Sequence, residues 1–379
     1  MKELLPEVAH DFQTKEQCYE YLEKIRWNGA PICPYCGSIN NVKLKHENRY
    51  HCNEAGCKRT FSVLIGTIFE ECRFPLPKYF MLIKLMLDAR KGVSSAQLSR
   101  NLELSYKTAW YAAMRVRCAM VETITDLHGV IEADESYIGG KPRKRNNKAG
   151  NNVADLSNVT IEHIKRGRGT KKIPVVGFVE RDGRVVTKVL ENLTSQKLLG
   201  MLHKYVKEDR SKIMTDDYRG YRKFDEEVQH LIVTHSEKEY VRGNVHTNTI
   251  EGFWSIIKNG LRGQYHVLSR KYLPFYLAEW SYKYNRRNAK EIQFHAFMKD
   301  AVSESKCFNN YKPRREPNDI VYPKRNKPPK AELKTFNKAN KAAGKDRKLK
   351  RKIAANKKSG AVVAKRRAGM PKGSKNKKK

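Results

Sequence analysis

The chain has 379 residues, which is long enough for two or three domains and at least one sizeable hydrophobic core. Lys and Arg number 77 against 40 Asp and Glu, so the formal net charge is +37. So large a positive charge favours nucleic acid as a partner over two alternatives, a merely solvated basic surface and a ribosome-associated protein. The sequence contains neither an apolar run of the roughly 18 to 20 residues that a membrane span needs nor a recognisable secretory signal. We therefore expect a cytoplasmic protein, associated with the nucleoid if the host is a bacterium.

Composition divides the chain into five regions. They are an N-terminal helical segment (1–27), a Cys-rich module (28–70), a helical region (77–122), an α/β domain (128–305) and a basic low-complexity tail (311–379). In the first region, apolar residues recur at helical spacing and predict a short amphipathic helix over 14–27.

Four of the eight cysteines are clustered, in a pattern typical of a zinc site. Two short pairs are separated by fifteen residues, and each pair lets two thiolates converge on one ion: Cys33, Cys36, Cys52 and Cys57. Four thiolates leave no open position on the metal, so we expect structural Zn²⁺ in a zinc ribbon. His51 is a possible but redundant ligand, and basic residues around the pairs favour contact with phosphate.

Residues 94–117 predict two helices joined by a tight turn. Ser94 is a preferred helix N-cap before a first helix that ends near Leu102, and a second helix runs from Tyr106 to Arg117. This is the pattern of a helix-turn-helix, whose second helix enters the major groove of DNA, although an ordinary helix pair fits about as well.

Acidic residues lie at the ends of two predicted strands. Glu132 and Asp134 share one face of the first strand, so Glu135 is expected to point away. Asp216 ends the second strand and is delivered before its neighbour Asp217. Acids on a buried strand are costly unless they bind a cation.

A third acid lies on a predicted helix. Glu251 and Lys258 are seven residues apart and share one helical face, which Asn248 joins. Two aspartates and one glutamate can hold two Mg²⁺ or Mn²⁺ ions, which suits phosphodiester cleavage and joining. We interpret Asp134, Asp216 and Glu251 as metal ligands and catalytic residues, and Lys258 as a cation beside the phosphate. Asn248 either assists Glu251 or replaces it.

Other segments add basic charge. The stretch from Lys141 to Lys172 reads as a basic loop or insertion, and residues 326–379 hold 21 Lys and Arg but two acids, which predicts disorder and phosphate binding. Basic residues also follow Lys258, among them Arg286 and Arg287. The aromatic residues interleaved with them are expected to be core rather than base-stacking: Tyr265, Tyr272, Tyr276, Trp280 and Tyr282.

Several motifs resemble bacterial insertion-sequence transposases that carry an N-terminal zinc ribbon and a DDE catalytic domain like that of retroviral integrases. The 35-residue separation of Asp216 and Glu251 is typical of that superfamily, as is a lysine at the position of Lys258. The resemblance runs from Trp27 to Arg287 through the motifs CPYCGS, RTFSVLIGTIFE, DESYIGGK, TDDYRGY and HTNTIEGFWSIIKNGL.

The resemblance implies an α+β multidomain protein with a ribonuclease H-like catalytic domain at 128–305. It implies a Mg²⁺-dependent DDE transposase that binds the terminal inverted repeats of its element, cleaves there and transfers the strands to target double-stranded DNA, as a homodimer or a larger synaptic complex. Some members of this family carry Asn in place of the third acid. A catalytically silent zinc-ribbon DNA-binding protein, either a regulator or a domesticated transposase, is the alternative.

Overall fold

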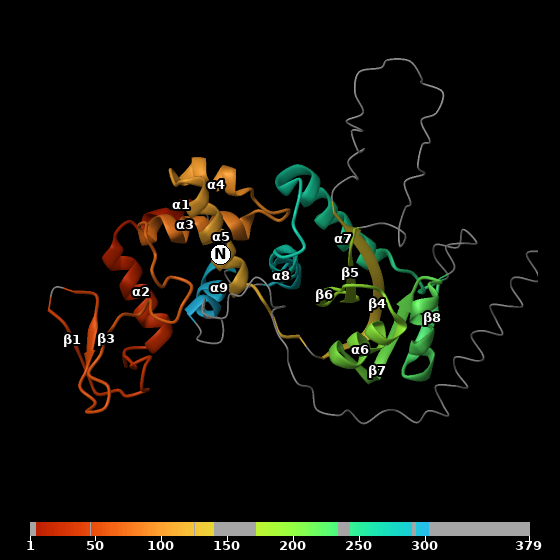
Figure 1. The fold of residues 1–379 in the computed structure, drawn as a ribbon, viewed down its shortest axis with the longest axis horizontal. Helices are drawn as coiled ribbons and strands as arrows, with labels where there is room; N and C mark the ends of the chain where they lie inside the picture. The colour runs from red at the N-terminus through yellow and green to blue at the C-terminus, as the bar shows by residue number, and fades with distance from the viewer. Residues whose placement is uncertain are drawn as a thin grey trace, which may run out of the picture.

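The computed structural model describes residues 5–45, 47–124, 126–139, 172–233, 243–289 and 293–302. Within these residues, a ribbon and a group of helices form the N-terminal part, and a larger sheet with its own helices forms the C-terminal part (Figure 1). In these ranges, no helix is long and apolar enough to span a membrane. The basic loop expected from Lys141 onward, apart from Lys172, and the basic tail fall outside them.

Two helices begin the described chain, α1 (Leu5–Asp11) and α2 (Lys15–Trp27). The second confirms the helix expected over 14–27. The Thr14 hydroxyl accepts the Gln17 N–H at 3.2 Å, and the Gln17 side chain accepts the Thr14 N–H at 2.8 Å, so a reciprocal capping box fixes its start.

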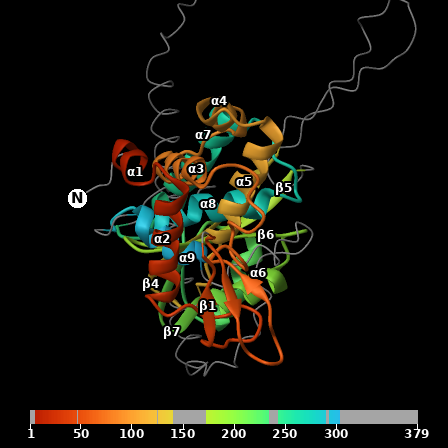
Figure 2. The ribbon, with the colours of Figure 1, turned by 90° about the vertical axis from the view of Figure 1, so that its left-hand side faces the viewer.

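The ribbon is a three-stranded antiparallel sheet in the order β1-β2-β3. Its strands are β1 (Asn41–Lys43), β2 (Tyr50–Cys52) and β3 (Thr60–Phe61). The rings of Trp27, Tyr50 and Phe61 pack together with centroids 5.4 to 5.8 Å apart, which joins the ribbon to the end of α2. Figure 2 shows the ribbon beside that helix.

Three further helices follow the ribbon: α3 (Leu76–Asp88), α4 (Ser95–Leu102) and α5 (Tyr106–Ala119). Ser94 and Ser105 cap the last two, and Glu103 ends α4 in the left-handed region with φ of 53°. The expected helix pair with a three-residue turn is therefore present. Its role in binding DNA is a separate matter.

The larger sheet has five strands in the order β6-β5-β4-β7-β8. Its first three strands are antiparallel, whereas β4, β7 and β8 are parallel. The strands are β4 (Leu127–Ile138), β5 (Ile173–Glu180), β6 (Val185–Val189), β7 (Val206–Thr215) and β8 (Gln229–Ile232).

Helices cover both faces of this sheet. The side chains of β5 are apolar on both faces, and because they alternate along the strand they contribute to two separate cores. Val175 and Val179 join one core with α7 (Asn248–Gly260) and α8 (Leu273–Asn285), between which lies the π-helix η5 (Leu261–Tyr265). Val176 and Phe178 join the other core with α6 (Ser195–Tyr205) and the 3-10 helix η3 (Arg219–Glu226).

The last described helix, α9 (Gln293–Val302), belongs to the N-terminal core although the predicted boundary groups it with the α/β domain. Phe294 lies 6.0 Å from Phe12 and 5.9 Å from Phe80, measured between ring centroids. The chain therefore returns from the large sheet, and α9 packs against the N-terminal helices.

A candidate acidic active site and a candidate zinc centre

The register of two parallel strands brings Asp134 and Asp216 together. Glu132 on β4 pairs with Met214 on β7, so Asp216, which follows the last residue of β7, lies level with Asp134. β4 continues to Ile138, beyond its last pair with β7 among the described residues. Carboxylate oxygens of Asp134, Glu135 and Asp216 lie within 4.8 Å of one another.

The third member of this group corrects the expectation that Glu135 points away. Strand alternation does hold, because Asp134 contacts Trp254 of α7 while Glu135 accepts a 2.9 Å hydrogen bond from the Tyr221 hydroxyl of η3 on the other face. Beyond the last β4–β7 pair, however, carboxylate oxygens of both side chains lie within 4.8 Å of Asp216. An adjacent acid at a strand end was the only signal for Glu135 in the sequence.

Asp134 sits in an enclosed and negatively charged environment. Burial, together with the neighbouring charges of Glu135, Asp216 and Glu251, raises the pKa of Asp134 to about 7. The Trp254 indole N–H donates to its Oδ2 at 3.1 Å. Burial and the charges of Glu135, Asp134 and Asp216 also raise the pKa of Tyr221 well above its ordinary value. The carboxylates therefore repel one another, which a bound cation would relieve.

The other predicted residues lie on α7. Glu251 is in the first turn, accepts a 3.3 Å hydrogen bond from the Thr247 hydroxyl, and is close enough to Asp134 to raise its pKa. It lies outside the group of carboxylates within 4.8 Å among the described residues. Asn248 and Lys258 are exposed on the same helix. The structure thus brings Asp134 and Asp216 together, and Glu251 lies outside their group but near enough to Asp134 to influence its charge.

The four clustered cysteines converge at the end of the ribbon. The Sγ atoms of Cys33 and Cys57 are 3.8 Å apart and those of Cys36 and Cys52 are 3.6 Å apart. A tetrahedral ion with Zn–S bonds of about 2.3 Å requires S···S distances of about 3.8 Å. His51 pairs with Thr60 in the sheet and is not in this group. The donor set therefore fits structural zinc.

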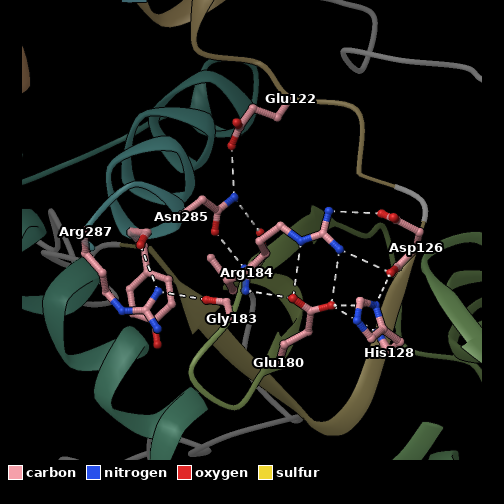
Figure 3. Close-up of polar contacts among 10 residues, drawn as sticks. Glu122, Asp126, His128, Glu180, Gly183, Arg184, Asn285 and Arg287 are labelled. Carbon is pink, nitrogen blue, oxygen red and sulfur yellow. Dashed lines mark hydrogen bonds and ion pairs between the residues drawn. The ribbon is translucent and has the colours of Figure 1, made fainter. Parts of the chain in front are cut away.

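Two of the basic residues that follow Lys258 have partners within the protein. Arg286 pairs with Glu122 and Asp300. Arg287 donates to the Gly183 carbonyl at 2.8 Å, close to the Arg184–Glu180 ion pair (Figure 3). The interleaved aromatic residues are largely buried, as expected: Tyr265, Tyr272, Tyr276, Trp280 and Tyr282 pack within the two cores.

Comparisons with known proteins match both parts of the chain. Residues 126–285 match the model of the ISXO2-like transposase domain, and residues 13–60 match the transposase zinc-ribbon domain, together more than half of the chain. A protein of Halobacterium salinarum, described as an uncharacterized protein in transposable element ISH50, is 26% identical over 272 residues, which cover 70% of this chain and 89% of that protein.

Solved structures give a weaker likeness. The crystal structure of the Mos1 strand transfer complex is 14% identical, covers 59% of this chain and 77% of its own, and has a TM-score of 0.25. A pre-cleavage Mos1 transpososome is 12% identical, covers 58% and 73%, and has a TM-score of 0.23.

Proposed function

We propose a chemical role for each part of this chain, which belongs to the insertion-sequence transposases that carry an N-terminal zinc ribbon and a DDE-type catalytic domain. The protein is a DNA transposase. The proposed reaction is cleavage at the ends of its own element followed by transfer of those ends to target DNA. The observation that carries this proposal is the meeting of Asp134, on β4, with Asp216, at the end of the adjacent strand β7, within the matched transposase domain.

The acidic group fits a divalent cation. Asp134, Glu135 and Asp216 offer only oxygen donors, and burial together with their mutual repulsion raises the pKa of Asp134, so a small hard cation such as Mg²⁺ or Mn²⁺ suits them. Glu251 on α7 would complete the ligand set. Divalent ions held by these carboxylates would supply activation of the attacking water or 3′-hydroxyl and stabilisation of the leaving oxygen.

The protein's own contribution is to hold these groups in place. The Trp254 indole orients Asp134, and the Tyr218 N–H donates to Asp216 Oδ1 at 3.1 Å. Lys258 and Asn248 lie on the exposed face of α7, where they can contact a phosphate of the DNA strand. In this role Asn248 supports Glu251 rather than replacing it.

The N-terminal part is proposed to bind the element's ends. The zinc site holds the ribbon, and the first turn of α5 exposes Tyr106 and Lys107 with Tyr111 one turn later, as a recognition helix requires. The mixed sheet, with Asp134 on β4 beside Asp216 at the end of β7, supports a ribonuclease H-like domain. Two DNA ends require two active sites, so a homodimer or larger complex is proposed.

A strand-transfer assay tests the proposed site. The full-length, zinc-loaded protein would be given Mg²⁺ or Mn²⁺, DNA carrying the element's ends, and target DNA. Asp134→Asn, Asp216→Asn and Glu251→Gln should each bind ends but lose about 100-fold or more of cleavage and joining, the scale of removing one group that stabilises charge in the transition state.

Asp217→Asn is the matched control, because Asp217 is the exposed neighbour of Asp216 and lies outside the acidic group. It should retain wild-type joining. Equal activity in all four variants would refute the site assignment. A larger loss in Asn248→Ala than in Glu251→Gln would make Asn248 the third ligand. A wild-type chain that binds ends but never cleaves them would favour the silent DNA-binding alternative.

A further inference from the structure

Glu132, two residues before Asp134, is a buried carboxylate that does not join the acidic group. Its side chain has no exposed surface. It accepts hydrogen bonds from the Thr249 N–H at 2.8 Å, the Ile250 N–H at 3.0 Å, the Thr249 hydroxyl at 3.0 Å and the Arg181 Nε–H at 2.8 Å. A carboxylate is buried at acceptable cost only when it is paired and fully hydrogen-bonded in this way.

These bonds supply the start of α7 with a cap that its own sequence lacks. Thr247 occupies the N-cap position but makes no side-chain cap bond. The first backbone N–H groups of a helix have no partners within it, and the helix dipole makes that end electropositive. Glu132, which is distant in sequence, satisfies two of those N–H groups from β4.

Arg181 connects Glu132 and the start of α7 to the neighbouring segments of the chain. Besides Glu132, its guanidinium donates to the carbonyls of Asn244 at 2.6 Å and His246 at 3.0 Å, both in the loop before α7, and contacts the Met214 sulfur at 3.0 Å. One side chain thus joins the end of β5, the end of β7 and the approach to α7. A planar guanidinium with several donors can bridge such a set, whereas an ammonium cannot.

We propose that Glu132 and Arg181 are positioning residues that set α7, and with it Glu251, against Asp134 and Asp216. This inference rests on the proposed function of those acids. Glu132 binds the first turn of α7, and Asp134, two residues later on β4, accepts the Trp254 indole N–H at 3.1 Å one turn further along the same helix. These two contacts hold the helix that carries Glu251 against the strand that carries Asp134.

Mn²⁺ binding to the full-length, zinc-loaded protein tests the proposal, with free Mn²⁺ followed by electron paramagnetic resonance and end cleavage measured in parallel. Glu132→Gln should weaken Mn²⁺ binding and slow cleavage about 10- to 100-fold, the usual effect of losing a partner that orients metal ligands. Binding of end DNA should not change. Raising Mn²⁺ should restore part of the cleavage rate, whereas it should restore none in Asp134→Asn.

The matched control is Glu180→Gln. Glu180 is also a buried carboxylate beside an arginine. It lies opposite Ile131 in the β4–β5 register, so its side chain is on the other face of the sheet from that of Glu132. There it binds Arg184 and accepts the His128 N–H (Figure 3). It should keep wild-type Mn²⁺ affinity. If Glu132→Gln fails to fold, Arg181→Lys is the milder variant, because it keeps the charge and loses the bridge.

A double variant tests whether the effect of Glu132 on Mn²⁺ binding passes through Glu251 of α7. If Glu132 acts through Glu251, adding Glu132→Gln to Glu251→Gln should weaken Mn²⁺ binding no further. The proposal is overturned if Glu132→Gln and Arg181→Lys bind Mn²⁺ like wild type, or no more weakly than Glu180→Gln, or if the two glutamate changes are additive. Failure of the proposed function is distinct, since Asp134→Asn itself would then bind and cleave normally.

Discussion

At the scale of single residues, a glycine opposite Asp134 allows the indole of Trp254 to reach that acid. Gly177 pairs with Asp134 across β4 and β5. A Cβ atom on Gly177 would lie 2.8 Å from the Trp254 ring and 2.9 Å from Ile250 Cδ1, closer than real Cβ contacts occur. The bare backbone therefore lets α7 pack directly on the sheet above the acids.

Gly177→Ala should push α7 outward and break the bond from Trp254 to Asp134. We expect a loss of about 1 to 3 kcal/mol in the free energy of unfolding, the usual cost of overpacking. Cleavage should fall at least tenfold while end binding is kept. Urea denaturation and the cleavage assay measure the two effects. Gly200→Ala, where nothing lies within 4 Å in α6, is the control and should not destabilise the fold. A stable, fully active Gly177→Ala would contradict this packing.

The residues that could be predicted from the sequence were those whose type and spacing alone indicate a role. Asp134 and Asp216 were singled out because acids on apolar strands are costly without a cation, and the structure brings the two together. Glu135 was missed because alternation alone does not show where a neighbouring strand ends. The partners of Glu132 could not be predicted, since its contacts with Thr249 and Arg181 join segments far apart in the chain.

At the scale of elements, local signals predicted α2, α4 and α5, whose starts carry Thr or Ser caps. The sequence did not predict that α9 joins the N-terminal core. Its apolar face is equally compatible with either part of the molecule, and only tertiary packing decides between them.

The zinc ribbon depends on its metal more than any other element. Its strands have three, three and two residues, too short for independent stability. Removing zinc, by chelation or by Cys36→Ser, should raise hydrogen exchange across β1 and β2 and leave β4 and β5 protected.

Hydrogen–deuterium exchange with mass spectrometry measures this prediction, alongside zinc content. Cys72→Ala is the control, because Cys72 lies outside the four-cysteine group and its loss should leave one zinc per chain. A ribbon that stays protected without zinc, or a Cys36→Ser protein that still holds a full equivalent, would contradict a structural metal site.

At the scale of the whole molecule, buried charges join the N-terminal helices to the sheet domain. Arg117 of α5 donates to Glu279 of α8 at 2.7 Å, and Lys283 pairs with the same carboxylate at 2.5 Å. These ion pairs, with Lys283 foremost, hold the pKa of Glu279 below its ordinary value despite burial. The Lys283 ammonium also donates to the Ala89 carbonyl. Helices that are proposed to bind DNA are thereby fixed to the domain that is proposed to cut it.

The measurement that tests the central claim most directly is iron-mediated cleavage of the protein's own backbone. Fe²⁺ replaces the divalent cation in the zinc-loaded chain, and peroxide with ascorbate generates hydroxyl radicals beside it. We expect cuts near Asp134, Asp216 and Glu251, suppressed by excess Mg²⁺ and absent in Asp134→Asn. Cuts confined to other segments, or an unchanged pattern in Asp134→Asn, would show that these acids do not hold the metal.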